Sequence, residues 1–361
     1  MLRSLRIENF RCFQMFELQQ LGKLNLLVGT NNSGKTSILE AVQLLNAQSN
    51  LESLREVMIG RGEYILSDER GSGQELDVRH LFYGHEVDEG SKFSIFGNND
   101  NDNDREGVTV SIKKTEQLNF FEDLREFVFV IKWLGLKNES IKLPLSSKEG
   151  LPLDYMKRVR RDFKNLGSRT QFVTSSSLTS EKMIEMFDQV VLTPEENLVT
   201  EALQTIEPSI KRIASVGSET YRSKGSTGSR SGFVVRLTDG DQRIPMGSMG
   251  DGIWRMLGLT LAIVNAQNGV LLVDEIDTGL HFSAMSNMWK LIWETAKRLN
   301  VQVFATTHNS DCCTSLAAIA SNENPSEEGI TIQRIEKGKT SSIVFTERQV
   351  LIAAERGIEV R

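Results

Sequence analysis

The segment that most constrains the fold of this chain is a polar loop of eight residues near its N-terminus. Gly29 to Thr36 reads GTNNSGKT and matches the pattern G-x-x-x-x-G-K-[ST]. An apolar run, KLNLLV, precedes the loop, and apolar residues recur at helical spacing from Ile38 to Leu45 after it. Strand, loop and helix thus follow in the order that a phosphate-binding loop requires.

The residue types in this loop fit nucleotide chemistry. Gly29 and Gly34 let backbone amides turn inward at a helix N-terminus, where they form an anion-binding nest. Lys35 has the reach to contact β- and γ-phosphates, and the hydroxyl of Thr36 suits Mg²⁺. The predicted cofactors are therefore ATP and Mg²⁺. The predicted nucleotide-binding residues here are Gly29, Thr30, Asn31, Asn32, Ser33, Gly34, Lys35, Thr36 and Ser37.

Two carboxylates follow a second apolar run. Val270–Val273 reads VLLV and is followed by Asp274 and Glu275. Ligands bind at the carboxyl ends of strands in parallel α/β sheets. We therefore expect Asp274 to hold the metal together with Thr36, and Glu275 to act on the attacking water as a catalytic residue.

A histidine follows a third strand pattern. Thr306-Thr307-His308-Asn309-Ser310 comes directly after the apolar run at 301–305. At the carboxyl end of a neighbouring strand, His308 is placed to contact a γ-phosphate or to orient water. We assign His308 as the second catalytic candidate because of this position, whereas His80, His85 and His281 are expected to be structural.

Helices and strands alternate in the C-terminal third. Helical patterns cover about 252–265 and 282–298, strand patterns cover 270–273 and 301–305, and a hairpin at 330–345 and a helix at 349–356 follow. The middle of the chain differs: strands are expected at 107–113 and 126–133, mostly helix at 153–163 and 181–213, and loops at 98–106 and 223–231.

The motifs taken together resemble the ABC-class ATPase heads of the OLD/RecF/SMC branch. The resemblance rests on LRIENFRCF at the N-terminus, GTNNSGKTSILEAV, SMGDGIWRML and DEIDTGLH, and it is closest to OLD-type heads. It implies an α/β P-loop NTPase fold: an ABC-ATPase-like head with a mixed sheet and an inserted helical lid. The predicted division is a split core, 1–50 and 240–361, around an insertion at 51–239.

The resemblance also implies roles at a subunit interface. In such heads Ser248 and Gly250 form the signature motif, which touches the γ-phosphate bound by the opposite subunit, and Asp277 lies in the D-loop at the same interface. Two heads would then enclose ATP as a homodimer or a higher homo-oligomer, and hydrolysis to ADP and phosphate would release them.

What such a switch controls stays open between three hypotheses. OLD nucleases continue into a Toprim domain, which we do not expect in this protein. The first hypothesis is therefore a sensor or motor subunit for a separate effector, such as a Toprim-like nuclease, in DNA-directed work or anti-phage defence. The second is an autonomous RecF-like DNA-repair clamp, although the segment after Asp274 departs from the RecF pattern. The third is an ATP-dependent dimerising scaffold without significant turnover.

Charge restricts any nucleic-acid contact to a local patch. The chain has 42 Lys and Arg against 48 Asp and Glu, a formal net charge of −6, which argues against binding nucleic acid over the whole surface. Residues 151–170 are locally basic, and DNA binding there would use Lys157, Arg158, Arg160 and Arg161. A solvated helix face is the plainer interpretation of the same residues.

Cysteine content and hydropathy bear on location. Three cysteines, two of them adjacent at Cys312 and Cys313, do not make a disulfide framework. No apolar run reaches the ~20 residues that a membrane span needs, and the N-terminus lacks a signal-peptide core. We expect a cytoplasmic protein without membrane contact.

Overall fold

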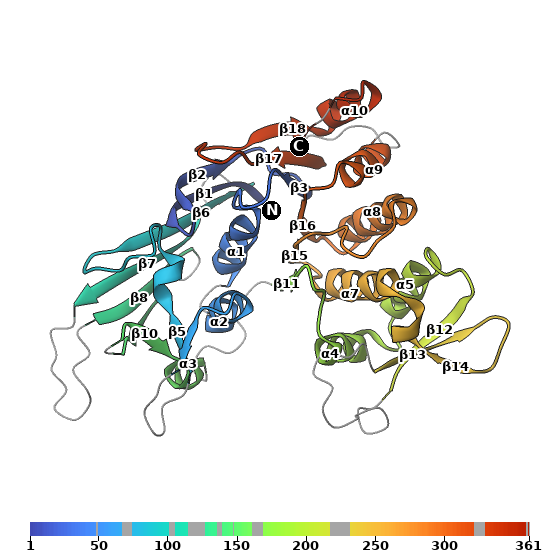
Figure 1. Ribbon diagram of the computed structural model, residues 1–361, viewed down its shortest axis with the longest axis horizontal. Coiled ribbons are helices and arrows are strands. Elements are labelled where there is room, and N and C mark those ends of the chain that lie inside the picture. The colour runs from blue at the N-terminus through green and yellow to red at the C-terminus, as the bar shows by residue number, and fades with distance from the viewer. Residues whose placement is uncertain are drawn as a thin grey trace. The chain divides into compact units, whose positions relative to one another are not determined.

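The computed structural model describes residues 1–47, 50–66, 74–100, 105–114, 127–135, 139–146, 148–160, 169–216, 232–320, 329–358 and 360. The chain divides into two compact units, each assembled from separate segments. Unit 1 comprises Met1–Leu21, Asn31–Ser168 and Ile335–Ile343. Unit 2 comprises Gly22–Thr30, Arg169–Arg334 and Val344–Arg361. Figure 1 shows the mixing as blue, orange and red strands side by side in the sheet of unit 2.

The sheet of unit 2 is built from strands that are buried on both faces. Its order is β11 (Thr170–Val173), β15 (Val270–Val273), β16 (Gln302–Thr307), β3 (Leu24–Val28), β17 (Ile330–Arg334) and β18 (Ile343–Thr346). The pairs from β11 to β17 are parallel. Every residue of β3, β15 and β16 is buried, which explains their continuous apolar sequences, since helix-covered parallel strands have no solvated face.

Helices cover this sheet. Figure 1 shows α9 (Ser310–Ala320), α8 (Phe282–Arg298) and α7 (Asp251–Asn265) in a row beside the strands. All residues of α7 from Ile253 to Val264 are buried, so its sequence is apolar all round, whereas α8 buries only one stripe of apolar residues. Further helices of unit 2 are α4 (Ser180–Val190), α5 (Pro194–Gln204) and α10 (Glu347–Glu355).

A second, smaller sheet of unit 2 packs on α4 and α5. It is antiparallel, with the order β12 (Ile210–Ser215), β13 (Phe233–Leu237) and β14 (Arg243–Pro245). The ring of Phe233 lies edge-on to Phe187 of α4 at 5.6 Å and to Trp254 of α7 at 6.1 Å, measured between ring centroids. These contacts fix one face of the small sheet against the helices.

Unit 1 contains a six-stranded antiparallel sheet and a three-stranded one. The first has the order β2 (Phe13–Leu18), β1 (Leu2–Phe10), β6 (Lys92–Asn99), β7 (Arg105–Lys114), β8 (Phe127–Leu134) and β9 (Glu139–Pro144). The second has the order β10 (Gly150–Pro152), β5 (Gln74–Asp77) and β4 (Tyr64–Leu66). The helices of this unit are α1 (Lys35–Asn46), α2 (Leu51–Gly60), α3 (Leu153–Arg160) and a short 3-10 turn, Val78–Leu81.

The α/β fold with a phosphate-binding loop between β3 and α1 is confirmed, and both parallel and antiparallel strands occur. β17 and β18 are neighbours, as expected for 330–345. The expectation that 181–213 is mostly helical is wrong at its end, because 210–213 belong to β12. The expected loop at 98–106 is wrong at both ends, because 98–99 belong to β6 and 105–106 to β7. Its middle, 101–104, and the expected loop at 223–231 lie outside the described residues. The predicted domain boundaries at 50 and 240 stay a prediction.

Candidate nucleotide site

Backbone conformation in the loop after β3 is set by positions with positive φ. The φ angle is 143° at Gly29, 59° at Asn32 and 98° at Gly34. Gly34 is the N-cap of α1 and offers no side-chain cap to that helix. The backbone amides and the dipole at a helix N-terminus favour an anion, so the local geometry fits a phosphate group.

Gly34 also lacks room for a side chain. A Cβ atom built there would lie 2.3 Å from Cζ of Phe13 and 2.8 Å from Sγ of Cys12. Cys12 lies in the turn between β1 and β2, and Phe13 is the first residue of β2. The loop therefore needs glycine at this position for its φ angle and for its close approach to that turn.

The hydroxyl of Ser33 provides a test of whether the loop fits a ligand. Ser33 is buried, and its Oγ has no hydrogen-bond partner among the residues that the structure describes. An unsatisfied buried polar group costs about 1–3 kcal/mol, and a bound phosphate group would supply the missing partner. Lys35 and Thr36 are half-buried at the start of α1.

The sheet of unit 2 brings three predicted motifs to one edge. Val273 pairs with Ala305, and Val28 pairs with Thr307. The segments that begin at Gly29, Asp274 and His308 therefore all leave the carboxyl ends of adjacent parallel strands. This is the edge at which ligands bind in α/β sheets.

Thr306 connects the two carboxylate residues at this edge. Its hydroxyl donates to Oδ1 of Asp274 over 2.6 Å and accepts from the amide of Glu275 over 2.8 Å. Glu275 has a φ angle of 46°, a conformation that is strained for a residue with a side chain and is often found at functional sites. A further hydrogen bond of 3.3 Å runs from Thr278 Oγ1 to Oε2 of Glu275.

Thr307 makes the corresponding contact with the predicted D-loop. Its hydroxyl donates to Oδ1 of Asp277 over 2.7 Å and accepts from the amide of Asn309 over 3.0 Å. His308 is exposed directly after these two threonines. The sequence placed TTHNS at the strand end, but it did not indicate that the two threonines orient Asp274, Glu275 and Asp277.

Arg255 is a second residue that the sequence reasoning missed. From α7 its guanidinium donates to the carbonyl oxygens of Thr174, Asp274 and Glu275, over 2.6, 2.9 and 2.9 Å. The side chain is 3% exposed, and burial lowers its pKa to about 10 although Asp277, Asp274 and Glu275 oppose the shift. The available signal was one arginine within the apolar run of α7.

The predicted signature residues precede α7. Ser248 lies in a 3-10 turn, Met246–Met249, where it is exposed and donates to the carbonyl of Pro245 over 2.7 Å. Gly250 is exposed with a φ angle of 98°. A Cβ atom on Gly252 would lie 3.2 Å from the carbonyl oxygen of Gly279, so the signature segment is adjacent to the loop that carries Asp277.

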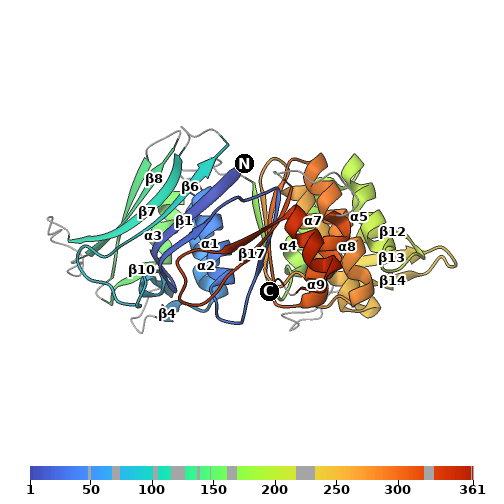
Figure 2. The same ribbon diagram turned by 90° about the horizontal axis from the view of Figure 1, so that it is seen from above.

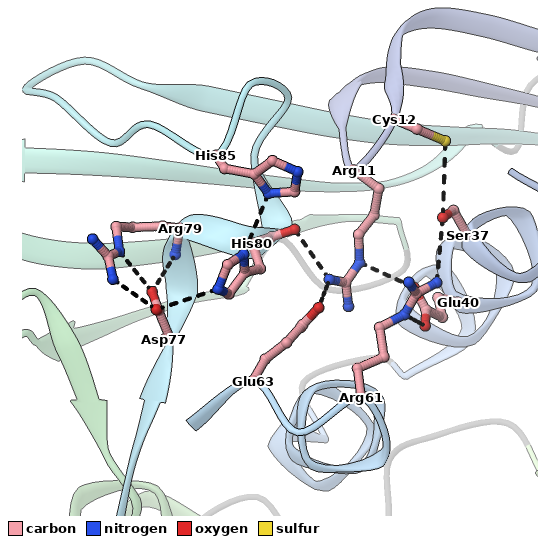
Figure 3. Close-up of polar contacts among 10 residues, drawn as sticks. All are labelled: Arg11, Cys12, Ser37, Glu40, Arg61, Glu63, Asp77, Arg79, His80 and His85. Carbon is pink, nitrogen blue, oxygen red and sulfur yellow. Dashed lines mark hydrogen bonds and ion pairs between the residues drawn. The ribbon is translucent and has the colours of Figure 1, made fainter. Parts of the chain in front are cut away.

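A buried ion-pair network holds α1 within unit 1 (Figure 3). Arg11, from the turn after β1, donates to Oε2 of Glu40 on α1 over 3.0 Å and also pairs with Glu63. Arg61 pairs with the other oxygen of Glu40 and donates to the Ser37 hydroxyl over 3.4 Å. The helix that begins at Lys35 is thereby tied to the two segments flanking it.

Burial controls the titration of this network. Loss of solvent raises the pKa of Glu40, and the nearby Arg11 and Arg61 partly counteract it. Burial likewise raises the pKa of the Cys12 thiol. Farther along the same unit, Arg79 hydrogen-bonds Asp77 and lowers the pKa of that carboxyl group.

The predicted DNA-binding side chains lie outside the part of the chain that the structure describes. Lys157, Arg158 and Arg160 are in α3, but their side chains, like the whole of Arg161, lie outside the described residues. Within the described ranges, no group of three or more His, Cys, Asp or Glu residues is placed to hold a metal ion. In those same ranges, no helix is long and apolar enough to cross a membrane.

Proteins similar to this chain are found among known sequences and among solved structures. A Helicobacter pylori protein named ATP/GTP phosphatase is 24% identical over 343 residues, 86% of each chain. The DNA replication and repair protein RecF of Chlorobium phaeovibrioides is 36% identical over 102 residues, 27% of each chain. Among solved structures, an SMC head bound to the C-winged helix domain of ScpA has a TM-score of 0.48 at 13% identity, covering 96% of this chain and 98% of that one.

Residues 24–311 match the family described as "AAA domain, putative AbiEii toxin, Type IV TA system". Because this match covers most of the chain, the protein belongs to that family of AAA-type ATPase domains.

Proposed function

We propose that the protein is a Mg²⁺-dependent ATPase head. The observation that carries this proposal is the register of the unit 2 sheet, which places Gly29, Asp274 and His308 after the carboxyl ends of neighbouring strands. The similarity to a protein named ATP/GTP phosphatase over most of both chains supports a nucleoside triphosphate as substrate.

The roles follow from the residue chemistry. Backbone amides of the loop bind the phosphates, and Lys35 neutralises the β- and γ-phosphates. Thr36 and Asp274 hold Mg²⁺, which when bound offsets charge on the same phosphates. Thr306 orients the Asp274 carboxylate, since it donates to Oδ1.

Glu275 is the proposed general base. Its amide is fixed by Thr306 and its carboxylate by Thr278, so it is oriented to accept a proton from the attacking water. His308 stabilises or senses the γ-phosphate from the end of β16. Hydrolysis then removes the contact that favours the closed state, which is how a γ-phosphate acts as a switch.

We further propose that two heads close on ATP. Ser248 and Gly250 are exposed, and their segment lies against the loop of Asp277; this supports a role for all three at a surface that meets the γ-phosphate held by a second copy. The proposal includes an OLD-like assignment and a cytoplasmic location. It also includes a separate effector protein, such as a nuclease in anti-phage defence.

A RecF-like clamp is the second candidate. It is favoured by the 36% identity to a protein named DNA replication and repair protein RecF, over 27% of each chain. Under this alternative, the basic segment with Lys157, Arg158, Arg160 and Arg161 contacts DNA, and no separate effector is needed. A tight co-purifying partner would favour the sensor over the clamp.

The nucleotide site is tested by Lys35→Ala. We expect affinity for a fluorescent ATP analogue to fall at least about tenfold, because a charged hydrogen bond contributes ~1.5–3 kcal/mol. Lys142→Ala, at an exposed position on β9, is the matched control and should bind as the parent does. Equal affinity of both variants and the parent in equilibrium titrations would end the assignment of Lys35.

A further inference from the structure

The outer face of the small sheet of unit 2 presents a row of three arginines. Arg212 of β12 pairs with Arg236 of β13, and Arg236 pairs with Arg243 of β14. Directly paired residues share a face of a sheet, so the three side chains project from the same side. We call Arg212, Arg236 and Arg243 the arginine row.

The burial pattern identifies this side as the solvent face. All three arginines are exposed, as is Lys211 beside them. The adjacent residues on the three strands point to the opposite face of the sheet. They are Ile213, Val235 and Ile244, which pair in the same way and are buried or half-buried. Figure 2 shows these strands projecting beyond α5 and α8, at the end of unit 2.

Repulsion within the arginine row destabilises the small sheet of the isolated chain. Cβ atoms of directly opposed residues lie ~4.5–5.5 Å apart, and like charges at that distance destabilise a sheet. Asp239 and Asp241, in the turn between β13 and β14, are the nearest acidic residues in sequence. Within the described ranges, neither forms an ion pair with the arginine row, and no other carboxylate does so. Such an arrangement fits a surface that is neutralised by an anionic ligand.

The spacing of the arginine row indicates a ligand with several phosphate groups. Adjacent strands lie ~4.8 Å apart, so the three Cα atoms span about 10 Å. A single phosphate meets one guanidinium, or two at most, whereas successive phosphates along a nucleic-acid strand meet all three. Guanidinium groups bind phosphate through paired hydrogen bonds.

The rest of the solvent face argues for a duplex rather than for another partner. The neighbouring row on this side of the sheet is Ala214, Val234 and Pro245, of which Ala214 and Pro245 are exposed and Val234 is buried. None of the three is aromatic. Single-stranded nucleic acid is held chiefly by stacking on aromatic rings, and protein partners are anchored by large apolar or aromatic groups. We propose that the arginine row binds the phosphate backbone of double-stranded nucleic acid, without reading its sequence.

The test is fluorescence anisotropy with a labelled 20-base-pair DNA of arbitrary sequence, in EDTA and without nucleotide. The triple variant Arg212→Gln, Arg236→Gln, Arg243→Gln should bind at least about tenfold more weakly at low salt, because three phosphate contacts are lost. The slope of log affinity against log salt should become shallower by about 2.7, at ~0.9 per phosphate contact.

The control variant carries the same change in net charge elsewhere. Lys113→Gln, Lys132→Gln, Lys142→Gln removes three exposed positive charges from the six-stranded sheet of unit 1, and it should bind DNA with the parent affinity and slope. Equal weakening by both triple variants would mean a general charge effect and would overturn the proposal. So would an unchanged affinity of the arginine variant.

Two competitors separate the alternative ligands. Unlabelled duplex should displace the probe, while single-stranded DNA of equal length or polyglutamate of equal charge should do so less effectively. Preferential displacement by either of these would contradict the duplex assignment. The arginine variant should bind ATP as the parent does, which would show that the variant is folded. DNA binding is measured without nucleotide, so a negative DNA-binding result would leave the ATPase proposal untouched.

Discussion

At the scale of single residues, Thr306 connects two residues of the proposed nucleotide site. One hydroxyl orients the Asp274 carboxylate and satisfies the amide of Glu275, which has positive φ. Thr306→Val removes both contacts at nearly constant volume. Without these contacts Asp274 and Glu275 lose their fixed orientation, and a small misplacement of a catalytic group can cost up to ~10²-fold in rate. We therefore expect the rate of ATP hydrolysis to fall at least about tenfold at saturating ATP.

A buried threonine away from the site provides the control for this change. Thr260→Val removes a hydroxyl that donates to the carbonyl of Met256 within α7 over 2.8 Å. Its hydrolysis rate should stay close to that of the parent in the same phosphate-release assay. If Thr306→Val also hydrolyses ATP at the parent rate, the threonine does not orient the catalytic residues.

Sequence patterns indicate the motif residues, but not the residues that hold those motif residues in position. Gly29 to Thr36 and Asp274–Glu275 were found because their spacing is local and follows from one strand end. Thr306 and Arg255 act through contacts that cross between strands or from a helix to strand ends. No local pattern records such contacts, so these two residues became visible only in the folded chain.

At the scale of elements, helix α1 depends on the charge of Glu40. This carboxylate is 2% exposed and pairs with both Arg11 and Arg61. Glu40→Gln leaves the Arg11 guanidinium, 4% exposed, without one of its charged partners. Breaking a buried ion pair from one side costs ~3–5 kcal/mol, and we expect a decrease of that size in the free energy of unfolding.

The same substitution at the surface is the matched control. Glu52 pairs with Arg55 one helical turn away on α2, where both side chains are partly exposed. Glu52→Gln should lower the free energy of unfolding by less than about 1 kcal/mol. Urea denaturation measures both variants, and an equally small effect at Glu40 would show that the buried network does not stabilise α1.

Elements with regular periodicity were predicted well, and irregular ones were not. The sequence predicts mostly helix up to 213, but the residues from Ile210 onward form β12. Ile210 and Ile213 are both buried and are three residues apart, which does not match the alternation of a regular strand. A register shift between Ile210 and Arg212 explains this spacing, because a β-bulge adds a residue and breaks the alternation of a strand. The arginine row likewise depends on cross-strand register, which no local sequence pattern records.

At the scale of the whole molecule, distant segments combine in one sheet. Unit 2 takes β3 from the N-terminal part and β15, β16 and β17 from the C-terminal part. The sequence predicted this combination because Lys35 and Asp274 both serve one nucleotide in the resembled family. It did not predict the long antiparallel sheet of unit 1, whose strands β6 and β9 carry no motif.

The central claim, that this AAA-family protein hydrolyses ATP through Glu275, is tested most directly by phosphate release from Glu275→Gln at saturating ATP and Mg²⁺. A general base contributes ~10²–10⁴-fold, so the account predicts a rate at least about 100-fold below the parent, with Glu294→Gln, on the exposed side of α8, unchanged. A Glu275→Gln rate equal to that of the parent would contradict the account.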